Sequence, residues 1–267
     1  MLEAAFAAAF GLIIGSFLNV CIYRMPRDLS VLRPSRSFCP GCESTIAWYD
    51  NIPVISYLLL GRRCRHCQAA IPFRYVLVEL ATGLLFFAVV LWLGPTLEAL
   101  KFCVFAAIQV ALVAMDLEER ILADEFTLGG IAVALIFAAF VPLPAPFFQF
   151  LLPEQLSKPW VSMVDAALSA GFLGFILWSI GALYLKLRGR EGLGLGDVKM
   201  VAMIGSFLGL GPGLLTVVTG SVLGSICGLL YIFFSKKDAS TYELPFGSFL
   251  GIGALLIAAW ARQGSIP

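Results

Sequence analysis

Long apolar runs recur along most of the chain, and they restrict its fold more than any other feature. The hydrocarbon core of a bilayer is about 30 Å thick and takes roughly 20 apolar residues per helical span. Backbone polar groups in lipid must pair within the segment, so such runs predict helices. About eight candidate spans lie at residues 2–23, 75–93, 98–115, 126–141, 163–186, 198–210, 214–234 and 247–261. The sequence therefore predicts an all-α polytopic membrane protein.

Composition agrees with this prediction. Of the 267 residues, 60% are hydrophobic and 13% are charged, whereas a soluble domain of this length needs a larger polar shell. The net charge of +1 gives no reason to expect a nucleic-acid partner, and we expect none. The first apolar run carries Glu3 in place of a basic leader region and meets Arg24 at its far end. We interpret it as a retained span and not as a cleavable signal.

The distribution of basic residues predicts the orientation. Cytoplasmic loops carry an excess of Lys and Arg, and segment 24–74 holds eight arginines. Threading eight spans from there places loops 116–125, 187–197 and 235–246 on the same side. With the boundary residues Lys186 and Lys199, this side holds fifteen of the 18 basic residues. We expect an inner-membrane protein with both termini outside the cytoplasm.

The chain is expected to have two parts. Residues 1–74 hold one span and a small polar cytoplasmic insert, and residues 75–267 form a seven-helix bundle. The proline-rich loop 142–161 argues against regular structure there, and Gly211-Pro212-Gly213 predicts a tight turn between two spans.

Four cysteines in the insert have metal-ligand spacing. Cys39 and Cys42 form one CxxC pair, Cys64 and Cys67 form another, and 21 residues separate the pairs. Two such turns can close a tetrahedral Zn²⁺ site, and a cytoplasmic compartment keeps thiols reduced. Four thiolates leave no open coordination position, so the predicted role is structural. A metal would also supply folding energy to an insert with little core of its own.

Two alternatives remain for this insert. One CxxC pair could act in redox chemistry, and His66, inside the second pair, could replace a thiolate. His66 is the single histidine of the chain. Serine-histidine-aspartate, cysteine-histidine and HExxH chemistries are therefore disfavoured.

Two aspartates are predicted to meet at the cytoplasmic membrane edge. Asp116 follows the third span and Asp197 precedes the sixth. A carboxylate at the centre of a span costs ~2.5–3.5 kcal/mol, which makes such residues functional candidates. Taken alone, each is also compatible with a surface carboxylate. As a close pair, one would stay protonated while the other is charged, which is the state used by aspartyl proteases.

The residues around these aspartates have their own interpretations. Gly192, Gly194 and Gly196 would admit a substrate backbone and irregular dihedral angles next to Asp197. Asp124 is expected to be the N-cap of the fourth span. Asp165 is interpreted as a dipole-complementing residue near a helix start, and Glu79, inside the second span, as a second-rank site candidate.

With these motifs, the chain resembles the bifunctional type IV prepilin peptidases, also called leader peptidase/N-methyltransferases. The resemblance covers nearly the whole chain, and it includes the two CxxC pairs, Asp116 and Asp124. It also rests on GSFLNV at 15–20 followed by Arg24 and Pro26, NIPVISY at 51–57, RYVLVE at 74–79, GLGDVKM at 194–200 and LPFG at 244–247. Two departures are Ala123, where the family usually has proline, and Ser248, where a proline often follows Phe-Gly. Neither is expected to touch the proposed carboxylates.

The resemblance implies that Asp116 and Asp197 are the catalytic pair of a membrane aspartic endopeptidase in a bacterial inner membrane. It would cut basic leaders from prepilins or pseudopilins of a type IV pilus or type II secretion system, after a glycine. It also implies N-methylation of the new N-terminus from S-adenosylmethionine, associated with residues 1–74. Asn19, Arg24 and Glu79 are candidates for the methyl-donor site because they are polar and lie near the cytoplasmic face.

Two other functions stay open. The GxGD motif also fits a peptidase that acts on other signal peptides. A zinc-regulated transporter would use the aspartates on an ion path, although the acids gather at one face and do not cross the bilayer.

Overall fold

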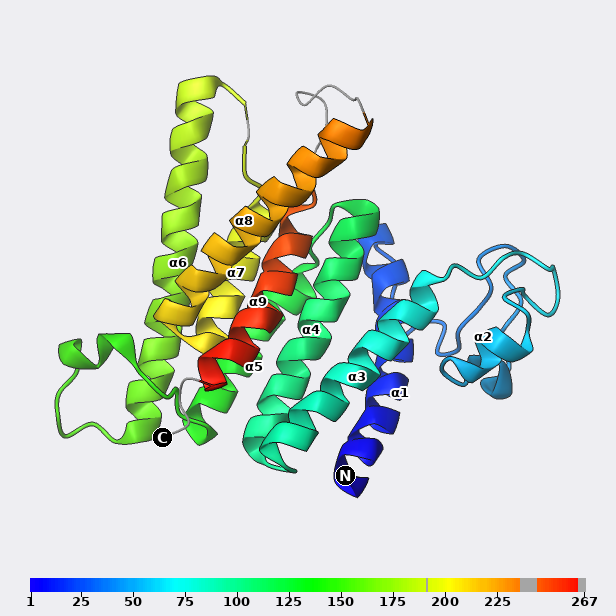
Figure 1. Cartoon of the computed structure of the whole chain (residues 1–267), viewed down its shortest axis with the longest axis horizontal. Helices are drawn as coiled ribbons and strands as arrows, with labels where there is room; N and C mark the ends of the chain where they lie inside the picture. The colour runs from blue at the N-terminus through cyan, green and yellow to red at the C-terminus, as the bar shows by residue number, and fades with distance from the viewer. Residues whose placement is uncertain (191, 236–243, 264–267) are drawn as a thin grey trace. The chain divides into compact units, whose positions relative to one another are not determined.

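The computed structural model describes residues 1–190, 192–235 and 244–263, and these form an all-α protein (Figure 1). Every predicted apolar segment coincides with a helix, so the fold class is confirmed. These helices are α1 (Leu2–Arg24), α3 (Arg74–Leu93), α4 (Leu97–Glu119), α5 (Asp124–Phe140), α6 (Lys158–Arg188), α7 (Leu195–Leu208), α8 (Leu210–Ser235) and α9 (Phe246–Gln263). The insert adds the short helix α2 (Ile55–Leu59) and two 3-10 turns, Met25–Arg27 and Trp48–Asn51.

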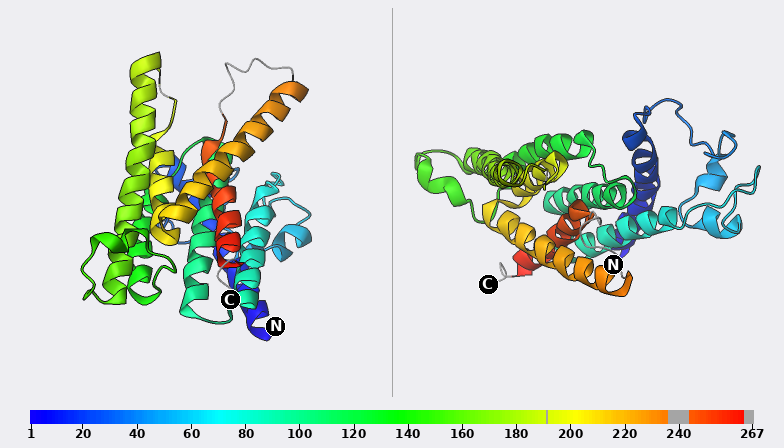
Figure 2. Two further views of the ribbon diagram at one scale, coloured as in Figure 1. Left: turned by 60° about the vertical axis from the view of Figure 1, so that its left-hand side comes forward. Right: turned by 90° about the horizontal axis from the view of Figure 1, so that it is seen from above.

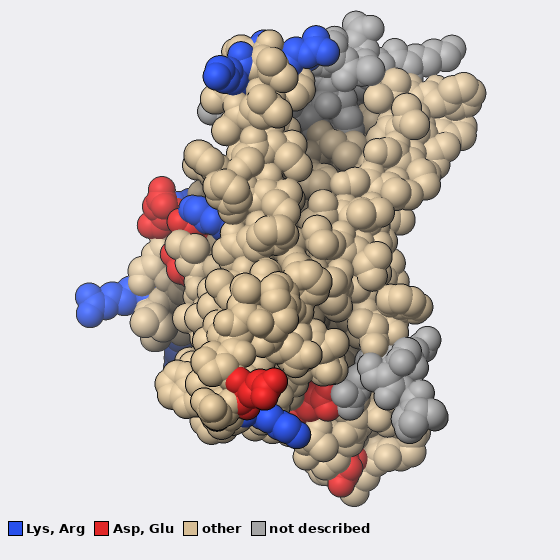
Figure 3. Space-filling model, turned by 90° about the vertical axis from the view of Figure 1, so that its left-hand side faces the viewer, with Lys and Arg blue, Asp and Glu red and all other residues tan. Residues whose placement is uncertain are grey.

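Five of the described helices are long and apolar enough to cross a membrane, namely α1, α3, α4, α6 and α8. Helices α5 and α7 are shorter, with 17 and 14 residues, and the apolar part of α9 is Phe246–Ala261. The face in Figure 3 is mostly uncharged, with charged side chains in a few small groups. The chain is therefore a multi-pass membrane protein. Most of the expected loop 235–246 lies outside the described residues.

The chain divides into two compact units, Met1–Ala114 and Met115–Pro267. In the first unit, α1 packs along α3, and glycines set the short distance between them. A Cβ added at Gly11 would lie 2.9 Å from the Gly83 Cα atom, and one at Gly15 would lie 2.7 Å from the Glu79 Cα atom. Close backbone contact of this kind is typical of membrane helix pairs. The domain boundary that was expected after residue 74 would separate α1 from α3, and the structure packs these two helices together.

The second unit is arranged around α7, which contacts α5, α6, α8 and α9 (Figure 2). Helices α7 and α8 are separated by a single residue, Gly209, whose φ of +86° is readily accessible to glycine. The predicted turn at Gly211-Pro212-Gly213 is therefore wrong. These residues form the first turn of α8, where proline is tolerated because early helical N–H groups have no intrahelical acceptor.

The predicted irregular loop 142–161 is only partly irregular. It contains a 3-10 turn, Phe147–Leu151, and α6 begins at Lys158 because Pro159 in the first turn suits a helix start. Asp165 does not simply complement the α6 dipole. Its buried carboxylate accepts a hydrogen bond from the Phe148 N–H at 2.6 Å and so attaches this loop to α6.

Candidate active site and metal centre

Asp116 lies in the last turn of α4, inside the second unit, and its side chain is buried. One carboxylate oxygen, Oδ2, accepts two hydrogen bonds from Ser248 at the start of α9. The backbone N–H donates at 2.6 Å and the hydroxyl Oγ at 2.7 Å. Because each donor points at the same oxygen, the orientation of the Asp116 carboxylate is set by α9.

Asp197 lies in the first turn of α7, just before the apolar segment 198–210, and is half-buried. Burial, followed by the negative charge of Asp116, raises the pKa of Asp197 to about 6. The structure thus brings the two predicted aspartates into one site, close enough for their charges to interact. Like charges in a partly desolvated site favour one protonated and one ionised carboxyl group.

Glycines pack closely around this pair. A Cβ at Gly247 would lie 3.2 Å from the Asp116 Cγ atom, and one at Gly196 would lie 3.1 Å from the Cβ of Leu122. Gly194 is the N-cap of α7 with an ordinary φ of −72°. The expected irregular dihedral angle is therefore not found at Gly194. The absence of a side chain lets the Gly247 backbone approach the Asp116 carboxylate and lets Leu122 pack against both Gly196 and Gly247.

Asp124 does not act as the N-cap of α5, as the sequence had suggested. Ala123 occupies the cap position, and the Asp124 carboxylate pairs with the Lys199 Nζ atom at 2.7 and 2.8 Å. Lys199 follows Asp197 by two residues in α7. The ion pair therefore joins the starts of α5 and α7. Because the Asp124 carboxylate is paired with Lys199, it is not a free third carboxylate beside Asp116 and Asp197.

Replacing Asp124 by Asn is expected to leave at least about a tenth of the cleavage activity. Both partners are partly exposed, with side chains 55% and 35% accessible, and such pairs contribute roughly 0–1 kcal/mol. Initial rates of leader removal by the purified variant test this. A loss as large as that from removing Asp197 would place Asp124 in the catalytic set.

The four insert cysteines come together as a metal-ligand cluster. The Sγ atoms of Cys39, Cys42, Cys64 and Cys67 all lie within 4.8 Å of one another, and those of Cys39 and Cys67 are 3.7 Å apart. Tetrahedral Zn–S bonds of about 2.3 Å place sulfurs about 3.8 Å apart. The arrangement fits Zn²⁺, and His66 is not a member of the cluster.

The two CxxC turns have the same backbone construction. In each, the residue four positions after the first cysteine, Glu43 or Gln68, has a positive φ (55° and 60°). Its N–H donates to the carbonyl of that first cysteine. Backbone N–H groups of Cys67 and His66 lower the pKa of Cys64 to about 6. Hydrogen bonds from Ser44 lower the pKa of Cys42. Both effects favour the thiolates that bind metal.

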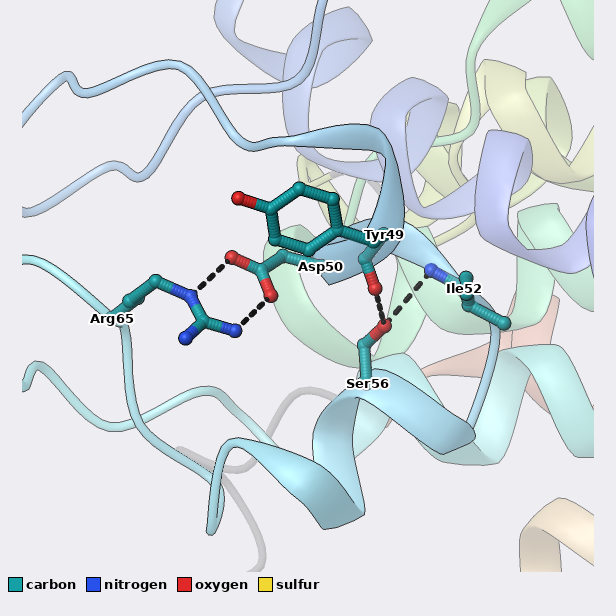
Figure 4. Close-up of polar contacts among 5 residues, drawn as sticks. All are labelled: Tyr49, Asp50, Ile52, Ser56 and Arg65. Carbon is teal, nitrogen blue, oxygen red and sulfur yellow. Dashed lines mark hydrogen bonds and ion pairs between the residues drawn. The ribbon is translucent and has the colours of Figure 1, made fainter.

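Polar contacts connect the second CxxC turn to the rest of the insert (Figure 4). Arg65 forms a two-point ion pair with Asp50, with Nε–Oδ2 at 2.7 Å and Nη2–Oδ1 at 2.6 Å. Ser56 accepts from the Ile52 N–H and donates to the Tyr49 carbonyl, both at 2.9 Å. These bonds shape the NIPVISY segment between the two cysteine pairs.

The three methyl-donor candidates lie in the first unit. Arg24 is buried and directs its guanidinium to the carbonyls of Ser30, Val31, Pro34 and Arg36. Its donors therefore shape the insert. Buried Glu79 accepts from the Val54 N–H at 2.7 Å and also hydrogen-bonds Ser16. Buried Asn19 donates to the Tyr75 carbonyl at 3.0 Å, while its Oδ1 acceptor has no partner among the described residues.

The expectation that Ser248 does not touch the proposed carboxylates is wrong, and Lys199 was not recognised as a site residue. Ser248 directly follows the recognised LPFG motif, and Lys199 lies within the recognised GLGDVKM motif. Their partners lie 132 and 75 residues away in sequence, so no local pattern indicates the contacts.

Comparison with known proteins identifies the family. Residues 9–93 match the bacterial peptidase A24 N-terminal domain, and residues 103–229 match the type IV leader peptidase family. A prepilin leader peptidase/N-methyltransferase of Aeromonas hydrophila is 33% identical over 94% of this chain and 88% of its own length. One from Pseudomonas aeruginosa is 32% identical over 95% and 89%. No solved structure matches the chain significantly.

A Myxococcus xanthus relative with the same name is 41% identical over 78% of this chain, and the match spans 56% of that relative's length. The two family models match successive parts of the chain, one over the helices that flank the cysteine insert and one over the helices that carry the aspartates. The chain belongs to the family of prepilin leader peptidase/N-methyltransferases.

Proposed function

We propose that the chain removes the basic leader from prepilins or pseudopilins, after a glycine, with Asp116 and Asp197 as the catalytic pair. One observation carries this proposal. Two acidic side chains from α4 and α7 share one partly desolvated site in which the charge of Asp116 acts on Asp197. Family membership supplies the substrate class, since the relatives are named for prepilin leader cleavage.

The chemistry follows from the unequal protonation of the pair. The ionised aspartate takes a proton from a water molecule, whose oxygen attacks the scissile carbonyl carbon. The protonated aspartate donates a hydrogen bond to the carbonyl oxygen and stabilises its developing charge. Proton transfer to the leaving amine then breaks the C–N bond and returns the pair to its starting state. No metal takes part in these steps.

The orientation proposed from the basic residues puts this site at the cytoplasmic edge, with both termini outside. A prepilin has a basic leader followed by an apolar helix, so its scissile bond lies at the membrane surface. A pair of aspartates at that depth would reach the bond with little vertical movement of the substrate.

A second activity, methylation of the new N-terminal amine, is proposed for the part of the chain that carries the insert. S-adenosylmethionine would supply the methyl group when bound. Its cationic centre suits the buried carboxylate of Glu79 and the Asn19 Oδ1 acceptor, which has no hydrogen-bond partner in the described part of the chain. Val54, which donates to Glu79, has a φ of +62°, a strained value for a β-branched residue and one often found at functional sites. Arg24 would contribute by shaping the adjoining loop.

The four cysteines are proposed to hold one structural Zn²⁺. Their thiolates fill a tetrahedral shell, so the metal would fold the insert and leave no coordination position for a reacting group. The Arg65–Asp50 ion pair would then connect the metal turn to the 3-10 turn Trp48–Asn51.

Mass spectrometry of a prepilin substrate, with and without S-adenosylmethionine, tests both activities together. We expect a cut directly after a glycine in either sample, and a mass increase of one methyl group only with the donor. Cleavage without methylation would remove the second activity alone. A panel of ordinary signal peptides serves as the comparison, because cleavage of those in preference to prepilins would contradict the substrate assignment. Ion flux in liposomes without any cleavage would favour a transporter.

A further inference from the structure

Ser248 is buried, 1% exposed, and stands in the first turn of α9. It donates both its backbone N–H and its hydroxyl to Oδ2 of Asp116. Two donors on one oxygen stabilise the charged form of a carboxyl group more than the neutral form. A proline at this position would have neither donor, and an alanine would keep only the N–H.

Asp197 has a different environment. Its carboxylate receives a backbone hydrogen bond from Gly194, and burial outweighs that contact. The two members of the pair therefore differ in their hydrogen-bond donors, because Asp116 receives two from Ser248 of α9 and Asp197 receives one from the Gly194 backbone.

We propose that Ser248 is a positioning residue that keeps Asp116 as the ionised member of the pair. Asp116 then takes the proton from the attacking water, and Asp197 donates the hydrogen bond to the substrate carbonyl. This inference rests on the proposed peptidase function, and it adds which of the two aspartates takes the proton from the attacking water.

The other charged groups around Asp116 do not reverse this assignment. Helix α7 contributes Asp197, together with Lys199, whose charge is paired with Asp124 of α5. Helix α4 itself adds Glu118 and Glu119 beyond Asp116. Helix α8 has no charged residue between Leu210 and Phe234. The described side chains of α9, Phe246–Ala261, carry no charge. Among these groups, Ser248 is the neighbour that contacts Asp116 with two hydrogen-bond donors.

The test is the pH dependence of kcat/KM for leader cleavage by the full-length enzyme in detergent, in wild type, S248A, S248T and S248P. The acidic limb reports protonation of the ionised aspartate in the free enzyme. We expect S248A to move that limb upward by about one pH unit and S248P to move it further, since donors to a charged group are lost. S248T keeps both donors and should restore the wild-type profile. KM should change less than kcat.

Ser206 offers a matched control, because it is also a buried serine of the second unit but donates to the Met203 carbonyl within α7. S206A is expected to leave the acidic limb in place. An unshifted acidic limb in S248A would overturn the proposal, as would a shift of the basic limb in its place. S248A remains informative if S248P does not fold. An enzyme that still cleaves with Asp116 replaced by Asn would refute the peptidase assignment itself, which is a separate outcome.

Discussion

Replacing Asp197 by Asn is expected to reduce leader cleavage by about 10²–10⁴-fold, the usual contribution of a positioned acid or base. Asparagine keeps the size of the side chain, but its amide N–H is a weaker hydrogen-bond donor to the developing oxyanion than the carboxyl O–H of protonated Asp197. The pKa of about 6 arises from burial and the charge of Asp116. Wild-type activity should accordingly fall as the pH rises above about 6, when the Asp197 proton is lost. Asp116→Asn should cost as much, because the site then lacks its base.

Initial rates on a purified prepilin, with circular dichroism to verify the helical fold, measure these losses. Glu118→Gln is the matched control, since Glu118 is an exposed acid two residues beyond Asp116 on the same helix. It is expected to keep wild-type activity. Full activity in either asparagine variant would contradict the assignment of the catalytic pair.

Replacing all four insert cysteines by serine is expected to remove about one Zn²⁺ per chain and to unfold the insert. Structural zinc sites contribute ~10–16 kcal/mol of apparent binding free energy to small domains. The two β-bridges of the insert, Phe38 with Thr45 and Arg63 with Ala70, each border a CxxC turn. Without the metal, the thiolate pairs would no longer hold these turns together.

Elemental analysis measures the zinc content per chain, and limited proteolysis measures whether the insert is folded. In the four-serine variant, new cleavage between residues 30 and 73 is expected. Cys227→Ser provides the control, since Cys227 is an exposed cysteine of α8 outside the cluster. That variant should retain both zinc and protease resistance. Wild-type protein that contains no metal after purification without chelators would rule out the site.

Much of the site was predictable from the sequence, for reasons that are local. The four cysteines have the spacing of a tetrahedral site, and a short turn gives each pair the same backbone geometry. Asp116 and Asp197 stand at the ends of apolar segments, so topology alone predicted that they face the same side. The start of α6 was less predictable, because the helix begins at Lys158, before the predicted apolar run from residue 163.

The interpretation of single polar side chains needed the tertiary structure. Asp124 fits an N-cap by its position but reaches Lys199 on α7, and Asp165 attaches a loop that the proline content had suggested was irregular. Aspartate does tend to occupy N-cap and first-turn positions of helices, and both residues lie near the start of a predicted span. These tendencies were overridden because a charged donor or a backbone N–H from another element lay within hydrogen-bond distance.

Composition and the length of the apolar runs determined by themselves that this is a multi-pass helical membrane protein. The motifs indicated its family and singled out Asp116 and Asp197 as the candidate catalytic carboxylates. Only the packing of α9 against the end of α4 decided that Ser248 donates two hydrogen bonds to Asp116. The physical reason is one of range. Helix formation depends on residues a few positions apart, whereas the charge state of a carboxyl group depends on whichever atoms folding places around it.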